Sequence, residues 1–170
     1  MDSQYPELYA SLEGDLIGQS DTKLADFRAR AAAQFLEQGF PSVRDEEWRY
    51  SNVSVLEKQA FVPVLASEIA VSIAADVAKH QLDDCWVMVF VDGHYAEALS
   101  NVAGLPDSVQ AMSLAQAIVK QPEQVYEYLG QVADNQTVGF TAFNSAWFSD
   151  GAFLQIAKNT QLEKPVQLLH

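Results

Sequence analysis

The stretch "CWVMVFVDGHYAEALS", residues 85–100, decides the fold class of this chain. Its first half is rich in β-branched and aromatic residues, and Asp92 and Gly93 form a two-residue turn before a second extended run. This pattern predicts a β-hairpin from Trp86 to Leu99. Because helical patterns precede and follow the hairpin, we expect an α+β fold.

The segments before the hairpin are expected to be helical. Ser20 or Asp21 precedes apolar residues at spacings of three and four, and Gly39 stands where a left-handed C-cap belongs. A shorter helix is expected around residues 5–13. Apolar residues four apart predict another helix within residues 67–81.

The remainder of the chain mixes both kinds of element. Residues 108–113 predict a strand, and residues 114–132 predict helix, with Pro122 placed to begin a second helix. Residues 140–148 predict a last short helix. Residues 150–170 have the pattern of a strand, a turn and a second strand.

The final strand, "PVQLLH" at residues 165–170, leaves two interpretations open. It is apolar and nothing follows it to pair with it, which is typical of the front part of a longer protein, since exposed apolar edges promote aggregation. Alternatively, it closes a sheet with the hairpin.

Composition restricts the classes of function. The 170 residues carry a formal charge of −13, which disfavours binding to a phosphate backbone. The single cysteine, Cys85, excludes an internal disulfide and a cysteine-built metal site, and fits a reducing compartment. The chain shows neither a signal-peptide pattern nor an apolar run long enough to span a bilayer. We therefore expect a soluble, cytoplasmic protein.

The segment "GFPSVRDEEWRY", residues 39–50, concentrates aromatic and charged residues after a helix end. We interpret it as a structural clamp with Phe40, Trp48 and Tyr50 as apolar contacts. Helical spacing would let Asp45 pair with Arg49, and would place Arg44 against Trp48. The clamp predicts that Trp48→Ala costs about 3–5 kcal/mol of stability.

Two chemical interpretations of the same segment are less favoured. Asp45, Glu46 and Glu47 form a poor acid–base pair, because consecutive helical residues point in different directions. Arg44 and Arg49 with the two aromatic residues could stack single-stranded bases, but the interleaved acids oppose this.

The other polar residues show no catalytic pattern. His80, His94 and His170 lack metal-ligand spacing, and we expect His94 on the surface of the hairpin. Cys85 is expected to be a small core or boundary residue. Asn144 is expected to be buried and to satisfy backbone groups. We therefore expect no catalytic, cofactor-binding or metal-binding residue, and no enzyme activity.

Four stretches together resemble the SufD branch of the SufB/SufD family of iron–sulfur cluster assembly proteins. The first is "RAAAQFLEQGFPSVRDEEWRYSNV", in which a helix ends in Gly-Phe-Pro and Glu-x-Trp-Arg-Tyr follows. The others are "VFVDGHYAEALS", "VQAMSLAQAI" and "FNSAWFSDGAFLQIAKNTQLEKPVQLLH", the last with Asn144, Asp150, Gly151 and Pro165. The Glu-x-Trp-Arg-Tyr stretch favours SufD over SufB.

The resemblance implies a domain plan and partners. Residues 1–60 would be the N-terminal helical region, residues 61–148 an α+β region, and residues 149–170 the first strands of a right-handed β-helix. In this family the subunits pair through their β-helices and bind the ATPase SufC. The resemblance therefore implies a non-catalytic scaffold subunit, a SufBCD complex component, that acts with SufB and SufC and has no cofactor in this segment.

Two other hypotheses stay open. One is a stand-alone protein-binding module without a β-helix. The other is an acidic hydrolase that uses Asp45, Glu46 or Glu47 with a histidine. If residues 149–170 are the first strands of a β-helix, these strands would be exposed edges in this chain. We therefore expect self-association through "AFLQIA" and "PVQLLH".

Overall fold

The chain folds into two compact units that interleave in sequence. The first contains residues 1–63 and 122–148, and the second contains residues 64–121 and 149–170. The computed structural model describes residues 5–12, 14, 16–18, 20–59, 61, 64, 74–133 and 139–170.

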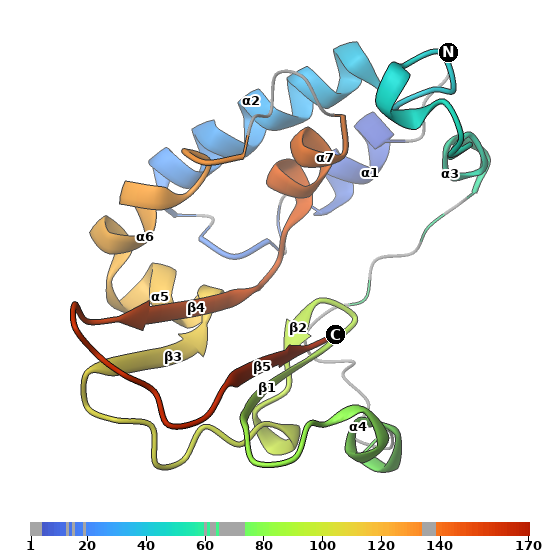
Figure 1. Ribbon diagram of the computed structural model, residues 1–170. Helices are drawn as coiled ribbons and strands as arrows, with labels where there is room; N and C mark the ends of the chain where they lie inside the picture. Colours follow the sequence, from blue (N-terminus) through green and yellow to red (C-terminus); the bar gives the residue numbers. More distant parts are fainter. Residues whose placement is uncertain are drawn as a thin grey trace. The chain divides into compact units, whose positions relative to one another are not determined.

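The first unit is helical (Figure 1). Its described elements are the helices α1 (Tyr5–Leu12), α2 (Thr22–Gln38), α3 (Val55–Lys58), α6 (Pro122–Tyr128) and α7 (Gly139–Trp147), and the 3₁₀ helix η1 (Glu46–Trp48). The helices α1, α2, α6 and α7 agree with the helices expected from the sequence. Pro122 begins α6, where its missing N–H costs nothing.

The ends of α2 show why the helix occupies these residues. Of the two expected N-caps, Asp21 is the one used, and its carboxylate accepts hydrogen bonds from the backbone N–H groups of Lys23 and Leu24. At the other end, Gly39 has φ 70° and donates its N–H to the Phe35 carbonyl. Its ψ of −166° differs from the left-handed helical conformation that we expected, so the chain leaves the helix in an extended direction.

An aromatic cluster forms the core of the first unit. Helices α2 and α7 pack along each other, and Tyr5 of α1 contacts both. The rings meet edge to face or tilted, with centroids 5.3 Å apart for Tyr5 and Phe35. The members of the cluster are Tyr5, Phe35, Phe40, Phe143 and Trp147.

Gly139 lets α7 begin close to the end of α2. A Cβ at this position would lie 2.0 Å from the Gly39 carbonyl oxygen, closer than any non-bonded contact allows. The glycine is therefore required by the approach of the two backbones rather than by its own φ.

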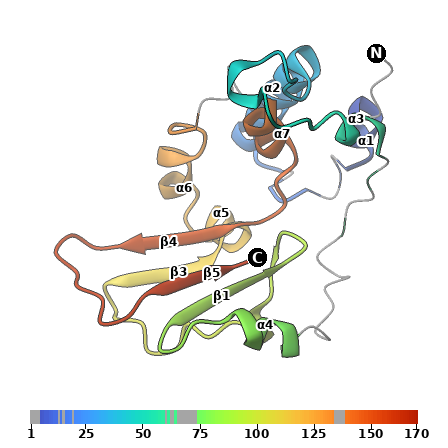
Figure 2. The same ribbon diagram turned by 45° about the vertical axis from the view of Figure 1, so that its right-hand side comes forward.

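The second unit contains the strands. Its described elements are α4 (Ala74–His80), β1 (Trp86–Val91), β2 (His94–Tyr95), η4 (Glu97–Leu99), β3 (Val109–Ser113), α5 (Leu114–Lys120), β4 (Ala152–Ile156) and β5 (Val166–Leu169). They form one sheet in the order β2-β1-β5 (Figure 1) and a two-stranded sheet of β3 and β4 (Figure 2).

The predicted hairpin is confirmed at β1 and β2. Phe90 pairs with Tyr95, and Val91 pairs with His94. The turn residues Asp92 and Gly93 both have positive φ, at 49° and 84°, as this kind of tight turn requires. The second strand is shorter than expected, because the chain passes into η4 after Tyr95.

β1 is buried along its whole length. One of its faces carries Val87, Val89 and Val91, which pack with Ala96 and with Val77 of α4. Of the helix predicted within residues 67–81, only residues 74–80 are seen as α4, and residues 67–73 lie outside the described residues.

Two expectations about the end of the chain meet different outcomes. The prediction that residues 165–170 form an unpaired strand is wrong, because β5 lies alongside β1 in parallel, from Trp86 with Val166 to Val89 with Leu169 (Figure 1). The alternative, in which this strand joins the hairpin sheet, is what the structure shows.

The predicted domain boundaries at residues 60 and 148 divide the chain into consecutive segments. The two units of the structure are instead defined by which residues pack together, and each unit combines two separate segments. The units group α6 and α7 with the N-terminal helices, and group residues 149–170 with the hairpin. The three predicted ranges, and the start of a β-helix at residue 149, stay predictions.

Candidate functional site

The free edges of β4 and β5 are the surface of the second unit that is best suited to bind further chain. β5 is the last strand in the order β2-β1-β5, and β4 has β3 as its partner in a two-stranded sheet. Within the described part of the chain, no strand covers the second edge of either one. A free strand edge presents backbone donors and acceptors that another strand can pair with.

β4 extends an apolar face that begins on its partner strand β3, where Val109 is buried. Val109 of β3 is buried, and it lies opposite Ile156 of β4, whose exposed fraction is 45%. Leu154 lies two residues away on the same face and is 38% exposed. The face that β3 buries thus continues onto β4 as partly exposed apolar surface.

β5 shows the same contrast between its two faces. Leu169 packs against the buried valines of β1, whereas Leu168 is 46% exposed. The strand Val166–Leu169 contains no charged residue. Charges and prolines are the usual protection of an edge strand, and this strand contains neither.

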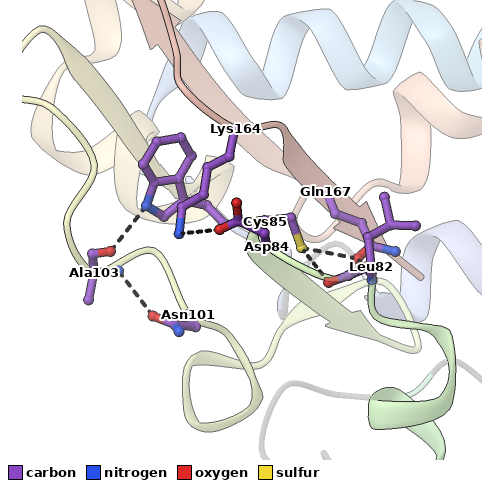
Figure 3. A network of polar contacts seen from close by, with 8 residues as sticks. Leu82, Asp84, Cys85, Asn101, Ala103, Lys164 and Gln167 are labelled. Carbon is purple, nitrogen blue, oxygen red and sulfur yellow. Dashed lines mark hydrogen bonds and ion pairs between the residues drawn. The ribbon is translucent and has the colours of Figure 1, made fainter.

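The side chain of Gln167 fixes β5 to the loop before β1. Its Oε1 accepts a hydrogen bond from the Leu82 backbone N–H at 2.9 Å (Figure 3). Its Nε2 donates to the His80 carbonyl at 2.9 Å. The thiol of Cys85 donates to the Leu82 carbonyl at 3.1 Å beside it. Cys85 is buried, which confirms the expected core position.

Lys164 and Pro165 hold the start of β5 against Trp86. The Lys164 ammonium lies 4.8 Å from the centroid of the Trp86 ring. It also lies 3.6 Å from an Asp84 carboxylate oxygen (Figure 3). The Trp86 backbone N–H donates to the Pro165 carbonyl at 3.0 Å, and its indole N–H donates to the Ala103 carbonyl at 3.1 Å. The edge formed by β5 is therefore held in place rather than loosely attached.

Asp150 positions the start of β4. One carboxylate oxygen accepts from the backbone N–H groups of Ala115 and Gly151, at 3.0 and 2.8 Å, and the other accepts from Tyr95 at 2.9 Å. Ala115 lies in the first turn of α5, where a carboxylate is favoured by the helix dipole. One side chain thus ties together β2, α5 and the residue before β4.

His94 is buried, so the prediction that it lies on the hairpin surface is wrong. Its Nε2 lies 2.8 Å from the Val64 carbonyl oxygen and 3.4 Å from Ser149 Oγ. Because a carbonyl oxygen can only accept, this nitrogen carries a proton and cannot take one from Ser149. The pair is therefore a structural contact and not a nucleophile with its base.

The remaining candidates for chemistry lie apart. His80 is exposed at the end of α4, and His170 stacks on Phe90 with ring centroids 4.9 Å apart. Across the described residues, no group of three histidine, cysteine or acidic side chains could hold a metal ion. Asn144 is exposed on α7, so the expectation of a buried, backbone-satisfying asparagine is wrong.

The segment of residues 39–50 contacts α7 through two of its three predicted aromatic residues. The ring of Phe40 lies 5.5 Å from that of Phe143, and the ring of half-buried Trp48 lies 5.2 Å from that of Phe140. Tyr50 is 91% exposed, so its predicted role as an apolar contact is wrong.

The acids of this segment do not converge on a reaction centre. Asp45 accepts hydrogen bonds from the backbone N–H and the hydroxyl of Ser42, and so closes a turn instead of pairing with Arg49. Arg49 lies over the ring of Tyr50, at 5.6 Å. Glu46 and Glu47 are exposed. The local geometry supports a structural role for this segment.

The apolar pattern of residues 165–170 does not single out the residues that shape the strand edge. The alternation of strand side chains is the signal that places Gln167 and Leu168 on opposite faces. The sequence does not single out Arg28 either: it is buried, it donates to the Phe148 carbonyl at 2.8 Å, and its guanidinium lies over the Phe148 ring.

No helix in the described ranges is long and apolar enough to cross a membrane.

Comparison with known proteins identifies the family. The chain is 32% identical over 166 residues to an iron–sulfur cluster assembly SufBD family protein of Synechocystis, which covers 96% of this chain and 36% of that protein. It is 30% identical over 164 residues to a SufBD family protein of Arabidopsis thaliana, covering 84% of this chain and 34% of that protein. It is also 32% identical over 98 residues to the iron–sulfur cluster assembly protein SufD of Escherichia coli, covering 46% of this chain and 21% of that protein.

The chain thus spans about a third of the length of the first two of these relatives. The family described as the SufBD protein N-terminal region matches residues 1–168. The match includes the first unit, and the second unit through β4 and as far as Leu168 of β5. The chain therefore belongs to the SufBD family of iron–sulfur cluster assembly proteins.

Proposed function

We propose that this chain is the N-terminal part of a non-catalytic scaffold subunit of iron–sulfur cluster assembly, of the SufD type. The observation that carries the proposal is the family match over residues 1–168. The relatives from Synechocystis and Escherichia coli are both named for iron–sulfur cluster assembly, which supports a role for this chain in the same process.

The partners in this proposal are a SufB-type subunit and a SufC-type ATPase, and the location is the cytoplasm. ATP hydrolysis belongs to the ATPase in this scheme, and the cluster is cargo rather than a resident cofactor of this segment. His94 is hydrogen-bonded to the Val64 carbonyl, and Asp45 accepts a hydrogen bond from the Ser42 N–H. These contacts support a structural role for both residues.

The edges of β4 and β5 are the proposed starting points of a right-handed β-helix. Each strand has a free edge with partly exposed apolar side chains, at Leu154, Ile156 and Leu168. A following strand of the same subunit would pair with the free backbone groups and cover these side chains.

A lysine substitution tests whether the edge is covered in the whole subunit. Leu168→Lys should lower the unfolding free energy of the full-length protein by about 2–4 kcal/mol, because the ammonium would be buried without a partner. In the 170-residue chain the same change should cost less than about 1 kcal/mol, since the side chain is already 46% exposed. Both values come from denaturant unfolding.

Leu36→Lys is the matched control, since Leu36 of α2 is 43% exposed and lies on the other unit. This substitution should leave the unfolding free energy nearly unchanged in both the full-length protein and the 170-residue chain. If Leu168→Lys lowers the unfolding free energy of the full-length protein no further than Leu36→Lys does, no strand covers the edge of β5, and the β-helix proposal is overturned. That result would favour a stand-alone binding module.

Self-association of the 170-residue chain follows from the same edges. Light scattering at increasing concentration should show dimers or larger species, and Leu168→Lys should reduce them, because a charge protects an edge strand. A strict monomer at high concentration would argue against exposed pairing edges.

A further inference from the structure

No further inference is drawn: the strongest candidate, the exposed apolar side chains of Val43, Tyr50, Val55 and Phe61 in the segment after α2, carries nothing because no contact in the described part of the chain shows what covers them.

Discussion

The two units of this protein are stabilised in different ways. The first unit is held by the aromatic cluster, in which rings from α1, from α2 and the residues after it, and from α7 pack against one another. The second unit is held by strand pairing and by single polar side chains, Asp150 and Gln167, that accept hydrogen bonds from backbone groups of distant segments. The stability of the helical unit is therefore sensitive to lost side-chain volume, whereas that of the strand unit is sensitive to lost hydrogen-bond acceptors.

The largest expected effect lies in the aromatic cluster. Phe35→Ala should lower the unfolding free energy by about 3–5 kcal/mol, because Phe35 is fully buried and contacts rings of α1 and α7. Denaturant unfolding measures this change. Leu36→Ala is the control on the same helix, where the partly exposed side chain should cost less than about 1 kcal/mol. Equal effects of the two substitutions would show that the aromatic cluster does not supply the stability of the first unit.

The strand unit is tested by Asp150→Ala. The change removes the acceptor of three backbone N–H groups, and leaving them unpaired should cost about 2–3 kcal/mol. Hydrogen exchange should accelerate at the amides of Tyr95 and Ala115. Asp107→Ala is the control, since Asp107 is an exposed acid in the same unit. Unchanged exchange at Tyr95 would contradict the account.

The segment of residues 39–50 gives an intermediate case. Trp48→Ala should cost about 2 kcal/mol, less than the 3–5 kcal/mol expected for a core aromatic, because Trp48 is half-buried against Phe140. Tyr50→Ala should change stability by less than about 0.5 kcal/mol, since its ring is exposed. Thermal unfolding compares the two. A neutral Trp48→Ala together with lost partner binding would replace the clamp with a docking role.

The smallest effect concerns a polar contact in the helical unit. The hydroxyl of Tyr126 donates to the Asp21 carboxylate, and this hydrogen bond is the main reason why the pKa of Asp21 lies below its ordinary value of 3.8. Burial is the main reason why the pKa of Tyr126 is raised. Because the folded pKa of Asp21 is lowered, its stabilisation is present above about pH 3.8 and is lost as the pH falls through the folded value.

Tyr126→Phe should therefore cost about 1 kcal/mol at pH 7, and the difference from the unaltered protein should shrink toward pH 2. Urea unfolding at several pH values measures it. Tyr128→Phe is the control, because Tyr128 is exposed on the same helix. A cost that is independent of pH would show that the lost interaction is packing and not the bond to the carboxylate.

Local signals in the sequence were sufficient for most elements. Asp21 and Gly39 mark the ends of α2 because capping depends on residues within one turn. Asp92 and Gly93 place the hairpin turn because few residues tolerate positive φ. The family resemblance also followed from short motifs, and the match over residues 1–168 confirms it.

Long-range contacts account for the errors. His94 is buried because it pairs with Val91 and reaches the Val64 carbonyl, thirty residues away in sequence. Tyr50 was expected to pack like Trp48, but only Trp48 contacts a ring of α7, whereas Tyr50 is 91% exposed. The pairing of β5 with β1 joins residues eighty positions apart, and neither strand's sequence specifies its partner.

The scaffold proposal is tested most directly by isolating the endogenous protein from cell extract with an antibody against this segment, and measuring its intact mass and its partners. The account predicts a mass roughly three times the 18.7 kDa of this chain, as the relatives' lengths suggest, together with a SufB-type subunit and a SufC-type ATPase. A mass of 18.7 kDa without either partner would contradict it.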